Sequence, residues 1–502
     1  MKEKPVSLRL KYLGIDTYKE AVIYLQKNCH ISESEGFEAQ TRIRVTLGER
    51  SILATLNIIE SEILQTDEAS LSKFGWQSLQ AQEGDLIQLS HSKPLTSLSF
   101  VRAKIFGHNF EQDKIQHIIQ DITEGYYSDI NIATFLTACA GSHLNEDEIR
   151  MLTEAMINIG DRLTWGRTRV FDKHCVGGLP GNRTSLIVVP IVTAFGLTMP
   201  KTSSRAITSP AGTADTMETL APVELNLRTM QKVVEKELGC IVWGGGVNLS
   251  PADDILIRVE RVMDLDSEGQ LIASVLSKKI AEGATDIVID IPVGPTAKVR
   301  TFEMGSMLKT LFVKIAASLN IRLNVLITDG NQPVGRGIGP ALEAEDVLSI
   351  LQNQFNAPQD LRERSLKLAG MILESSGQVT SGNGYAVAST LLIEGKAWQK
   401  FQAICAAQGG MREPPIAKFT HDITASFRGK VISINNRLIA RVAKLAGAPQ
   451  DKAAGITLHT PLQTAVERDQ PLFTIHAESK GKLRYALSLL TEIPPIQVEV
   501  GE

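Results

Sequence analysis

The stretch that decides the fold is KHCVGGLPGNRTS, residues 173–185, which runs directly into the apolar segment LIVVP. It places a cation, three glycines and two hydroxyl side chains in front of a segment with the composition of a buried helix. Glycines let the backbone approach an anion closely, and the amides at the start of a helix point towards it. Lys173 would add a full charge and Ser185 a hydroxyl donor. A phosphate-binding loop is therefore expected here, with a surface turn and a solvated lysine as the alternative.

A second polar stretch follows at residues 203–213, with the sequence SSRAITSPAGT. It holds five hydroxyl side chains and an arginine within eleven residues, from Ser203 to Thr213. This is too polar for a core strand and denser in donors than an ordinary turn. We expect a second loop that lines an anion or sugar site. An apolar segment at 185–200, interpreted as a buried helix, would join it to the first loop.

A third informative stretch is DLDSEGQLIASVLSKK, residues 264–279. Ser274 and Lys278 are four residues apart and would share one face of a helix. Asp266 precedes that helix, where it is either an N-cap or a functional carboxylate. The pair Lys278 and Lys279 is interpreted as part of a solvated helix face, because the net charge of −4 gives no basic surplus for nucleic acid.

The rest of the chain organises around these loops. Strand-like runs at 284–291 and 322–328 alternate with helical segments such as 270–282, which predicts a mostly parallel sheet with ligands beyond its strand ends. Period-two alternation at 42–47 predicts a β-rich start of the chain. Helical periodicity between 113 and 162 predicts a helical subdomain. The expected domains are a small β-rich N-terminal domain (1–90), a helical domain (95–167 plus 251–282), an α/β phosphate-binding domain (168–250 plus 283–412) and an α+β C-terminal domain (420–502).

Composition sets the class of protein. Hydrophobic residues make up 43% of the chain and charged residues 22%, as in soluble globular proteins. The most apolar run, 185–200, is shorter than the ~20 residues that a bilayer requires. We expect no signal peptide, because the first five residues lead into no apolar run. The cysteines show no CxxC spacing, so we also expect a reducing cytoplasm and no metal site. The five scattered cysteines are Cys29, Cys139, Cys175, Cys240 and Cys405.

Together the three stretches resemble the thymidine/pyrimidine-nucleoside phosphorylase family, from about residue 95 to the end of the chain. The most specific match is the segment from Ser203 to Glu218, and the Lys-His-x-x-Gly-Gly loop is the second. The N-terminal extension and the run 204–213 are most similar to AMP phosphorylases. A bacterial subgroup of the same length is classed with thymidine phosphorylases. The resemblance implies a helical and an α/β domain with a cleft between them, and at least a homodimer.

The resemblance also implies roles for single residues. Residues that correspond to phosphate-binding positions are Lys173, Ser185, Ser203 and Thr213. Residues that correspond to base-contacting positions are His174, Arg258, Ser274 and Lys278. Nucleotide-binding positions of the AMP branch are Gly178, Ser204, Arg205, Ala206, Ile207, Thr208, Ser209, Thr213, Ser274 and Lys298. The proton donor of that branch corresponds to Asp266, which joins His174 and Lys278 as a catalytic candidate. One departure is Cys175, where many relatives have serine, a stronger donor.

The function expected from these observations is phosphorolysis of thymidine or another pyrimidine nucleoside, with inorganic phosphate as substrate and no cofactor. Phosphorolysis of AMP or another 5′-monophosphate to base and ribose 1,5-bisphosphate is the alternative. A Mg²⁺-dependent phosphoribosyltransferase is a further class, for which Asp253 and Asp254 are the nearby acidic pair, although a helix first turn explains them equally. A non-catalytic nucleotide-binding protein is the last class. The expected partners are a small-molecule nucleoside or nucleotide and phosphate, with no nucleic acid polymer and no membrane.

Overall fold

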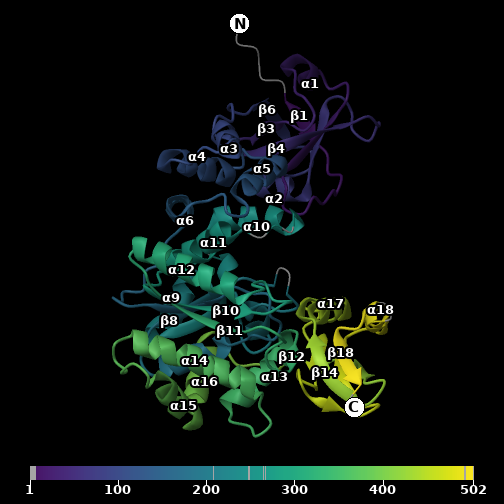
Figure 1. Cartoon of the computed structure of the whole chain (residues 1–502). Helices are drawn as coiled ribbons and strands as arrows, with labels where there is room; N and C mark the ends of the chain where they lie inside the picture. The colour runs from purple at the N-terminus through teal and green to yellow at the C-terminus, as the bar shows by residue number, and fades with distance from the viewer. Residues whose placement is uncertain are drawn as a thin grey trace. The chain divides into compact units, whose positions relative to one another are not determined.

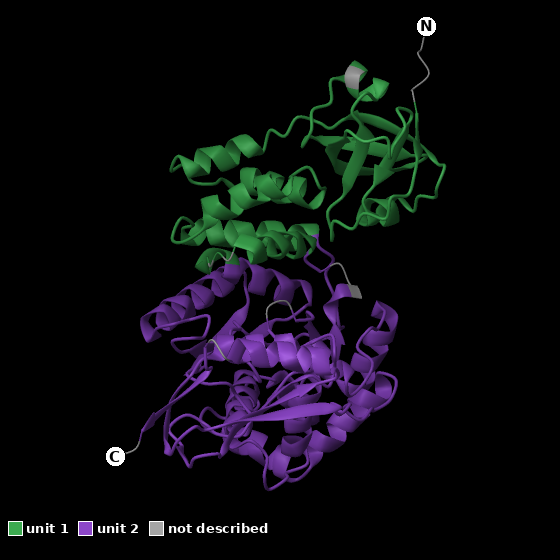
Figure 2. Ribbon diagram, turned by 90° about the vertical axis from the view of Figure 1, so that its right-hand side faces the viewer, with its two compact units in different colours: residues 1–159, 251–270 green, residues 160–250, 271–502 purple. Residues whose placement is uncertain are grey.

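A computed structural model of the chain describes residues 7–206, 209–246, 249–263, 265, 267–490 and 493–500. The described residues form two compact units, which are coloured separately in Figure 2. Unit 1 comprises residues 1–159 and 251–270, and unit 2 comprises residues 160–250 and 271–502. Each unit is described by itself below.

Unit 1 begins with a closed six-stranded barrel, in the strand order β1-β5-β2-β4-β3-β6. The predicted strand at 42–47 is confirmed as β3, in which the alternating Ile43 and Val45 are buried in the barrel core. Closing the sheet leaves no unpaired edge, so a domain of this size can bury its apolar side chains in one interior. The elements of the barrel are β1 (Leu8–Leu10), β2 (Val22–Gln26), α1 (His30–Glu35), β3 (Arg42–Leu47), β4 (Arg50–Ile59), β5 (Glu68–Leu71), α2 (Lys73–Leu79) and β6 (Leu86–His91).

Helices make up the rest of unit 1, as their periodicity predicts. Asn145 and Glu148 cap α6 reciprocally: the Glu148 amide donates to the Asn145 side chain at 2.9 Å, and the Asn145 amide donates to Glu148 at 3.0 Å. Asp253 and Asp254 lie in the first turn of α10, where negative charge favours a helix N-terminus. The helices are α3 (Leu98–Ile105), α4 (Gln112–Thr123), α5 (Asp129–Cys139), α6 (Glu146–Ile159) and α10 (Pro251–Met263).

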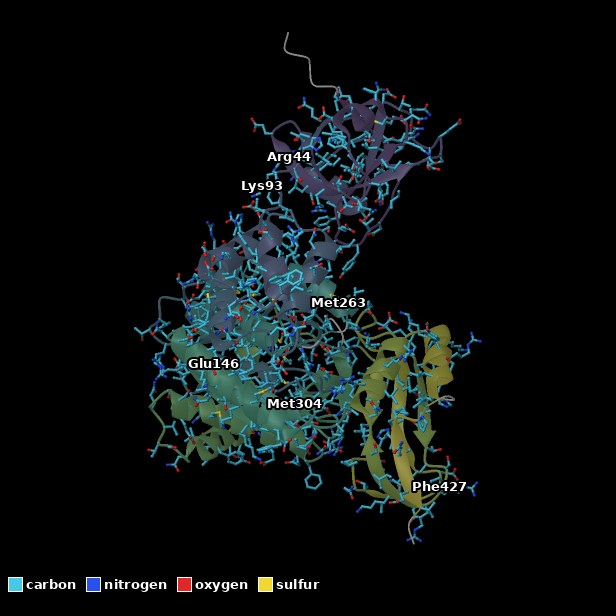
Figure 3. The ribbon with its side chains drawn as sticks, turned by 45° about the horizontal axis from the view of Figure 1, so that its top comes forward. Arg44, Lys93, Glu146, Met263, Met304 and Phe427 are labelled. Atoms are coloured by element: carbon cyan, nitrogen blue, oxygen red, sulfur yellow. The ribbon has the colours of Figure 1, made fainter. Side chains whose placement is uncertain are left out.

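The barrel and the helices of unit 1 meet around Tyr126. The Arg44 guanidinium donates to the Tyr126 hydroxyl at 3.0 Å, and the Lys93 ammonium lies 4.2 Å from the centre of the Tyr126 ring. Figure 3 labels Arg44 and Lys93 close together on this part of the chain. Arg42 extends the contact by donating to the backbone carbonyl of Gly125. A strand of the barrel is thus tied to the turn after α4.

Unit 2 contains the expected parallel sheet, and this confirms the α/β fold class. Strands β11, β10 and β7 are parallel neighbours, and β8 pairs with β9, also in parallel. The amide of Phe171 donates to the carbonyl of Thr198 at 2.9 Å, which joins β7 to the segment before β8. The strands are β7 (Phe171–Cys175), β8 (Met199–Ser203), β9 (Gly239–Trp243), β10 (Asp286–Val293) and β11 (Arg322–Asp329).

Helices cover this sheet, as Figure 1 shows. One prediction needs correction: the apolar segment is not a single helix from 185 to 200. Helix α7 ends at Ala194, because Gly196 takes a left-handed φ of +106°, and β8 starts at Met199. The helices are α7 (Ser185–Ala194), α8 (Thr213–Glu218), α9 (Leu227–Glu237), α11 (Glu268–Ala281), α12 (Phe302–Ser318), α13 (Pro340–Leu351), α14 (Gln359–Ser375), α15 (Gly384–Ile393) and α16 (Lys396–Ala407), with a 3₁₀ turn η1 (Gly244–Gly246).

The C-terminal part of unit 2 is α+β, with one sheet ordered β12-β15-β17-β13 and another ordered β16-β14-β18. Asn436 connects it to the α/β part, because its backbone amide donates to the Thr296 hydroxyl at 3.1 Å and its side-chain amide donates to the Gly330 carbonyl at 2.9 Å. Among the described residues, no helix has the length and apolar character needed to cross a membrane. The elements are β12 (Gly337–Ile338), β13 (Phe419–Thr424), β14 (Gly429–Ile434), α17 (Asn436–Ala446), β15 (Gly455–Leu458), β16 (Ala465–Val466), β17 (Pro471–Ala477), α18 (Lys480–Leu490) and β18 (Ile496–Val500).

Candidate active site

The first donor-rich stretch forms the end of β7, a loop and the start of α7. Lys173 lies on β7 with a side chain that is almost fully buried, and its ammonium group donates to the hydroxyl of Thr184 at 2.5 Å. Thr184 immediately precedes α7, and its hydroxyl does not cap that helix. Ser185 is the first residue of α7 and is buried. Lys173 and Ser185 are therefore brought to the same helix N-terminus, where amide groups favour an anion.

Two glycines allow the loop between β7 and α7 to pack against other backbone segments. Gly178 has a φ of +81°, and a Cβ at this position would lie 2.4 Å from the backbone nitrogen of Lys298. Gly181 has a φ of +74°, and its Cβ would lie 2.1 Å from the carbonyl oxygen of Val334. Only glycine fits such contacts in this conformation. The loop thus places Lys298, a predicted nucleotide-binding residue, directly beside Gly178.

The second donor-rich stretch leaves β8 at Ser203 and returns to α8 at Thr213. Its two ends meet, since the Asp215 carboxylate accepts hydrogen bonds from the amides of Ala206 at 2.6 Å and Gly212 at 3.0 Å. The Ser203 hydroxyl donates to the carbonyl of Ser204 at 3.0 Å. The Asp215 carboxylate thus ties the start of the loop to its end, and the Ser203 hydroxyl lies at the carboxyl end of β8.

Other members of this loop make internal contacts. The Arg205 guanidinium donates to both oxygens of Glu218 at 2.8 Å and to Glu224 at 2.8 Å, and it lies over the ring of Trp243. Hydrogen bonds from Arg205 lower the pKa of Glu218 to about 2. The Ser209 hydroxyl donates to a carbonyl two residues on. Arg205 thus organises the loop, and its contact with a nucleotide stays a prediction.

Arg183 joins the two loops, a role that the sequence did not reveal. Its guanidinium donates to the Thr213 hydroxyl at 3.2 Å and to the Ala211 carbonyl at 3.0 Å. The same group forms an ion pair with Glu343 on α13, whose side chain is 1% exposed. Arg183 stands inside the quoted motif, but its partner comes from a distant part of the chain. Only the tertiary structure brings the two together.

A buried cluster of charges lies on β7, β8 and α11. The Asp172 carboxylate accepts from the Lys201 ammonium at 2.9 Å and lies 3.0 Å from the Lys279 ammonium. Lys279 also contacts Glu282 at 2.8 Å, and Glu282 accepts a hydrogen bond from the Thr202 hydroxyl. The four charged residues are each 4% exposed or less. The prediction that Lys279 lies on a solvated helix face is therefore wrong, because its charge is neutralised inside the fold.

Electrostatics within this cluster are strongly perturbed. Burial alone would raise the pKa of Asp172, but the ammonium groups of Lys201 and Lys279 outweigh it and hold that pKa below its usual value. Burial lowers the pKa of Lys201 to about 8. His174 follows Lys173 on β7 and is half-buried. Its pKa lies well below the usual value, because burial and the surrounding lysines disfavour a further positive charge. Its imidazole is therefore neutral at physiological pH.

Ser274 and Lys278 lie on α11 with half-buried side chains, in the same helix as Lys279. The Lys278 charge contributes to lowering the pKa of His174. Three predicted base-contacting residues are thus held by β7 and α11, and the buried cluster of Asp172, Lys201, Lys279 and Glu282 connects these two elements.

Cys175 ends β7 and is held by a polar chain. The Asn182 side-chain amide donates to the Cys175 sulfur at 3.2 Å and to the Asp290 carboxylate at 3.0 Å. Asp290 also accepts from the Thr328 hydroxyl at 2.6 Å. Burial, followed by the charge of Asp290, raises the pKa of the Cys175 thiol to about 11. The thiol is therefore protonated, and its S–H remains a weak donor.

The roles of four further predicted residues stay predictions. Arg258 belongs to unit 1, where its guanidinium forms a bidentate pair with Asp129, with both distances 2.6 Å. Ile207, Thr208 and Asp266 lie outside the described residues. Within the described ranges, no group of three or more His, Cys, Asp and Glu side chains could hold a metal ion.

Comparisons with known proteins bear on this arrangement. Residues 167–398 match the family model described as the glycosyl transferase family, α/β domain. Residues 98–160 match the helical bundle domain of the same family. Residues 430–497 match the pyrimidine nucleoside phosphorylase C-terminal domain. The three matches follow one another along the chain and leave out the N-terminal barrel.

Whole proteins are similar as well. The chain is 60% identical over 491 residues to a protein of Legionella pneumophila (strain Paris) named "Putative thymidine phosphorylase", covering 98% of this chain and 95% of that protein. A protein of Polaromonas sp. (strain JS666 / ATCC BAA-500) with the same name is 56% identical over 483 residues, covering 96% and 94%. The crystal structure of anthranilate phosphoribosyltransferase from Thermus thermophilus covers 61% of this chain and 98% of its own, with a TM-score of 0.51 and 18% identity, and shows the fold alone.

The near full-length identity and the sequence of matched domains lead to one assignment. The chain belongs to the thymidine/pyrimidine-nucleoside phosphorylase family, in its long form with an N-terminal extension, and is a pentosyltransferase.

Proposed function

We propose that this enzyme catalyses the phosphorolysis of a pyrimidine nucleoside, converting thymidine and inorganic phosphate to thymine and 2-deoxyribose 1-phosphate. The observation that carries the proposal is the meeting of two donor-rich loops at one helix N-terminus. Lys173 bonds to the residue before Ser185, and Arg183, two residues before Ser185, bonds to Thr213. Such a concentration of donors suits a phosphate dianion.

The reaction requires phosphate on the face of the sugar opposite the base. A phosphate oxygen forms a bond to C1′ while the bond from C1′ to the base nitrogen breaks, and the electron pair leaves with the base. Positive charge develops on the sugar ring, and the bound phosphate stabilises it. In this scheme Lys173, Ser185, Ser203 and Thr213 hold the phosphate and supply its orientation.

The departing base needs hydrogen-bond donors for the negative charge that it gains. His174, neutral because of burial and the surrounding lysines, can donate one N–H to a pyrimidine carbonyl oxygen. Lys278 and Ser274 on α11 are the further donors in this proposal, with Arg258 as the fourth. The names of the similar proteins from Legionella and Polaromonas support a pyrimidine nucleoside as substrate. The proposal includes no cofactor.

One observation favours a second candidate, the phosphorolysis of a nucleoside 5′-monophosphate such as AMP. The Gly178 loop packs against the backbone of Lys298, so the segment that carries this cation borders the loop of the proposed phosphate site. That cation, with hydroxyls of the loop from Ser204 to Ser209, could hold a 5′-phosphate. The products would be free base and ribose 1,5-bisphosphate, and Asp266 would protonate a departing purine.

A substrate panel tests both candidates. The enzyme is incubated with thymidine, uridine, AMP or CMP, with and without phosphate, and base release is measured by chromatography. We expect phosphate-dependent release of thymine from thymidine. If phosphate-dependent release occurs only from AMP or CMP and not from a nucleoside, the second candidate is selected. Base release that is indifferent to phosphate would overturn both, and loss of activity on adding a chelator would favour a Mg²⁺-dependent phosphoribosyltransferase.

Two variants sharpen this panel. Lys173→Gln should abolish the phosphate-dependent release of base, because it removes the full charge at the phosphate loop, whereas Lys396→Gln changes an exposed lysine and serves as control. Asp266→Asn should lower kcat only with a purine nucleotide if this carboxyl is the proton donor. An unchanged kcat with every substrate would remove Asp266 from the mechanism.

A further inference from the structure

Arg183 and Glu343 form a buried ion pair next to the proposed phosphate site. The Arg183 side chain is 11% exposed and Glu343 is 1% exposed. Glu343 is fixed by two further donors, the Thr216 hydroxyl at 3.1 Å and the Gly339 amide at 3.3 Å. Removing a charge from water costs free energy, so a buried ion pair is not explained by stability alone. Its geometry has to supply a reason for its presence here.

The geometry of the guanidinium supplies that reason. One of its terminal nitrogens donates to the Thr213 hydroxyl oxygen and the other to the Ala211 carbonyl, so the fork spans the end of the second loop. A hydroxyl has one hydrogen and two lone pairs. Because Arg183 occupies a lone pair of Thr213, the hydroxyl hydrogen is left to be donated elsewhere. A donor with full charge also polarises that hydroxyl.

We propose that the ion pair of Arg183 and Glu343 is a clamp that orients the Thr213 hydroxyl towards phosphate and so sets the affinity of the enzyme for phosphate. This inference rests on the proposed function. Arg183 is a positioning residue that acts through Thr213, and Glu343 holds the guanidinium in place. In the ionised pair, the positive end lies at Thr213 and the negative end lies on α13.

The test measures initial rates against phosphate concentration at saturating thymidine. Arg183→Lys keeps the charge but cannot reach both Thr213 and Ala211. It should raise the KM for phosphate about tenfold, the size expected for losing a charge-assisted hydrogen bond, with kcat and the KM for thymidine changed less than about threefold. Glu343→Gln, which retains the shape of the side chain, should raise the KM for phosphate in the same direction.

Arg169→Lys is the matched control. Arg169 also pairs with a buried carboxylate, Asp286, but it precedes β7 at the opposite end of that strand from the loops. Its replacement should leave the KM for phosphate unchanged. The stabilisation of each variant by added phosphate, measured as a rise in Tm, gives a second readout of binding that does not depend on turnover.

A double variant separates positioning from direct contact. If Arg183 acts through Thr213, Arg183→Lys should change the KM for phosphate less than about twofold in a Thr213→Val background, since residues that act as a unit are not additive. A further tenfold rise in that background would overturn the clamp. An unchanged KM for phosphate in Arg183→Lys, with a phosphate-dependent wild type, would overturn the clamp alone. A wild type indifferent to phosphate would overturn the proposed function as well.

Discussion

Replacing Asp172 by asparagine tests whether the buried charge cluster holds β7, β8 and α11 together. The change keeps the size of the side chain and removes the carboxylate that lies 2.9 Å from the Lys201 ammonium and 3.0 Å from the Lys279 ammonium. Removing one partner of a buried pair costs about 3–5 kcal/mol. We expect the lower end, because Lys279 keeps Glu282 and because Lys201, with a pKa lowered to about 8 by burial, can release its proton.

Hydrogen–deuterium exchange of peptides that cover β7 and β8 measures this loss locally, without assuming that the whole chain unfolds in one step. A loss of about 3 kcal/mol corresponds to a roughly 150-fold drop in protection. The drop should be smaller at high pH than at neutral pH, since Lys201 is then neutral. Glu394→Gln breaks the exposed pair with Lys396, 47% and 57% exposed, and should cost less than about 1 kcal/mol. An equally small loss in Asp172→Asn would refute the reasoning.

Three further predictions concern the loops and their charges. Gly177 has a φ of +95° and open space where a Cβ would lie, so Gly177→Ala should lower the free energy of thermal unfolding by about 1–2 kcal/mol. Gly178→Ala should lower it further and raise the KM for phosphate, because the new Cβ would lie 2.4 Å from the backbone nitrogen of Lys298. His174, with its lowered pKa, should give imidazole NMR signals that do not titrate near pH 6.5, and an inflection there that His174→Gln abolishes would contradict this. Burial raises the pKa of Glu343 from 4.5 to about 7, so between these two pH values the folded chain binds a proton that the unfolded chain has released. The free energy of unfolding should therefore fall as the pH rises from about 4.5 to about 7. The denaturant midpoint of Glu343→Gln should not show this fall with pH.

Local patterns in the sequence predicted much of the fold. The alternation at 42–47 became β3, and the capping pair Asn145 and Glu148 forms both of its hydrogen bonds. These signals depend only on neighbours along the chain, so a pattern of period two or a cap is enough to find them. The end of α7 was misplaced, because the conformation of Gly196 decided it and the hydrophobic run did not.

The site was less predictable for a different reason. Hydroxyls and glycines marked the two loops, but composition does not say which cation faces which carboxylate. Lys279 was assigned to a solvated helix face because the net charge gives no basic surplus, and only the packing of α11 against Asp172 explains its burial. Arg183 was part of the quoted motif without a role, because Glu343 reaches it from another helix. Such pairings are properties of tertiary structure.

The burial of Cys175 beside Asp290 has a consequence for resistance to oxidants. Thiols react with peroxides and disulfides as thiolates, and a thiol with a pKa raised to about 11 is almost entirely protonated in the cell. Burial and the charge of Asp290 therefore keep the nucleophilicity of this sulfur atom low at the end of β7. Sulfenic acid formation at Cys175 would add an oxygen beside the proposed phosphate loop. We expect this enzyme to tolerate oxidising conditions that inactivate enzymes whose anion-binding cysteines are ionised.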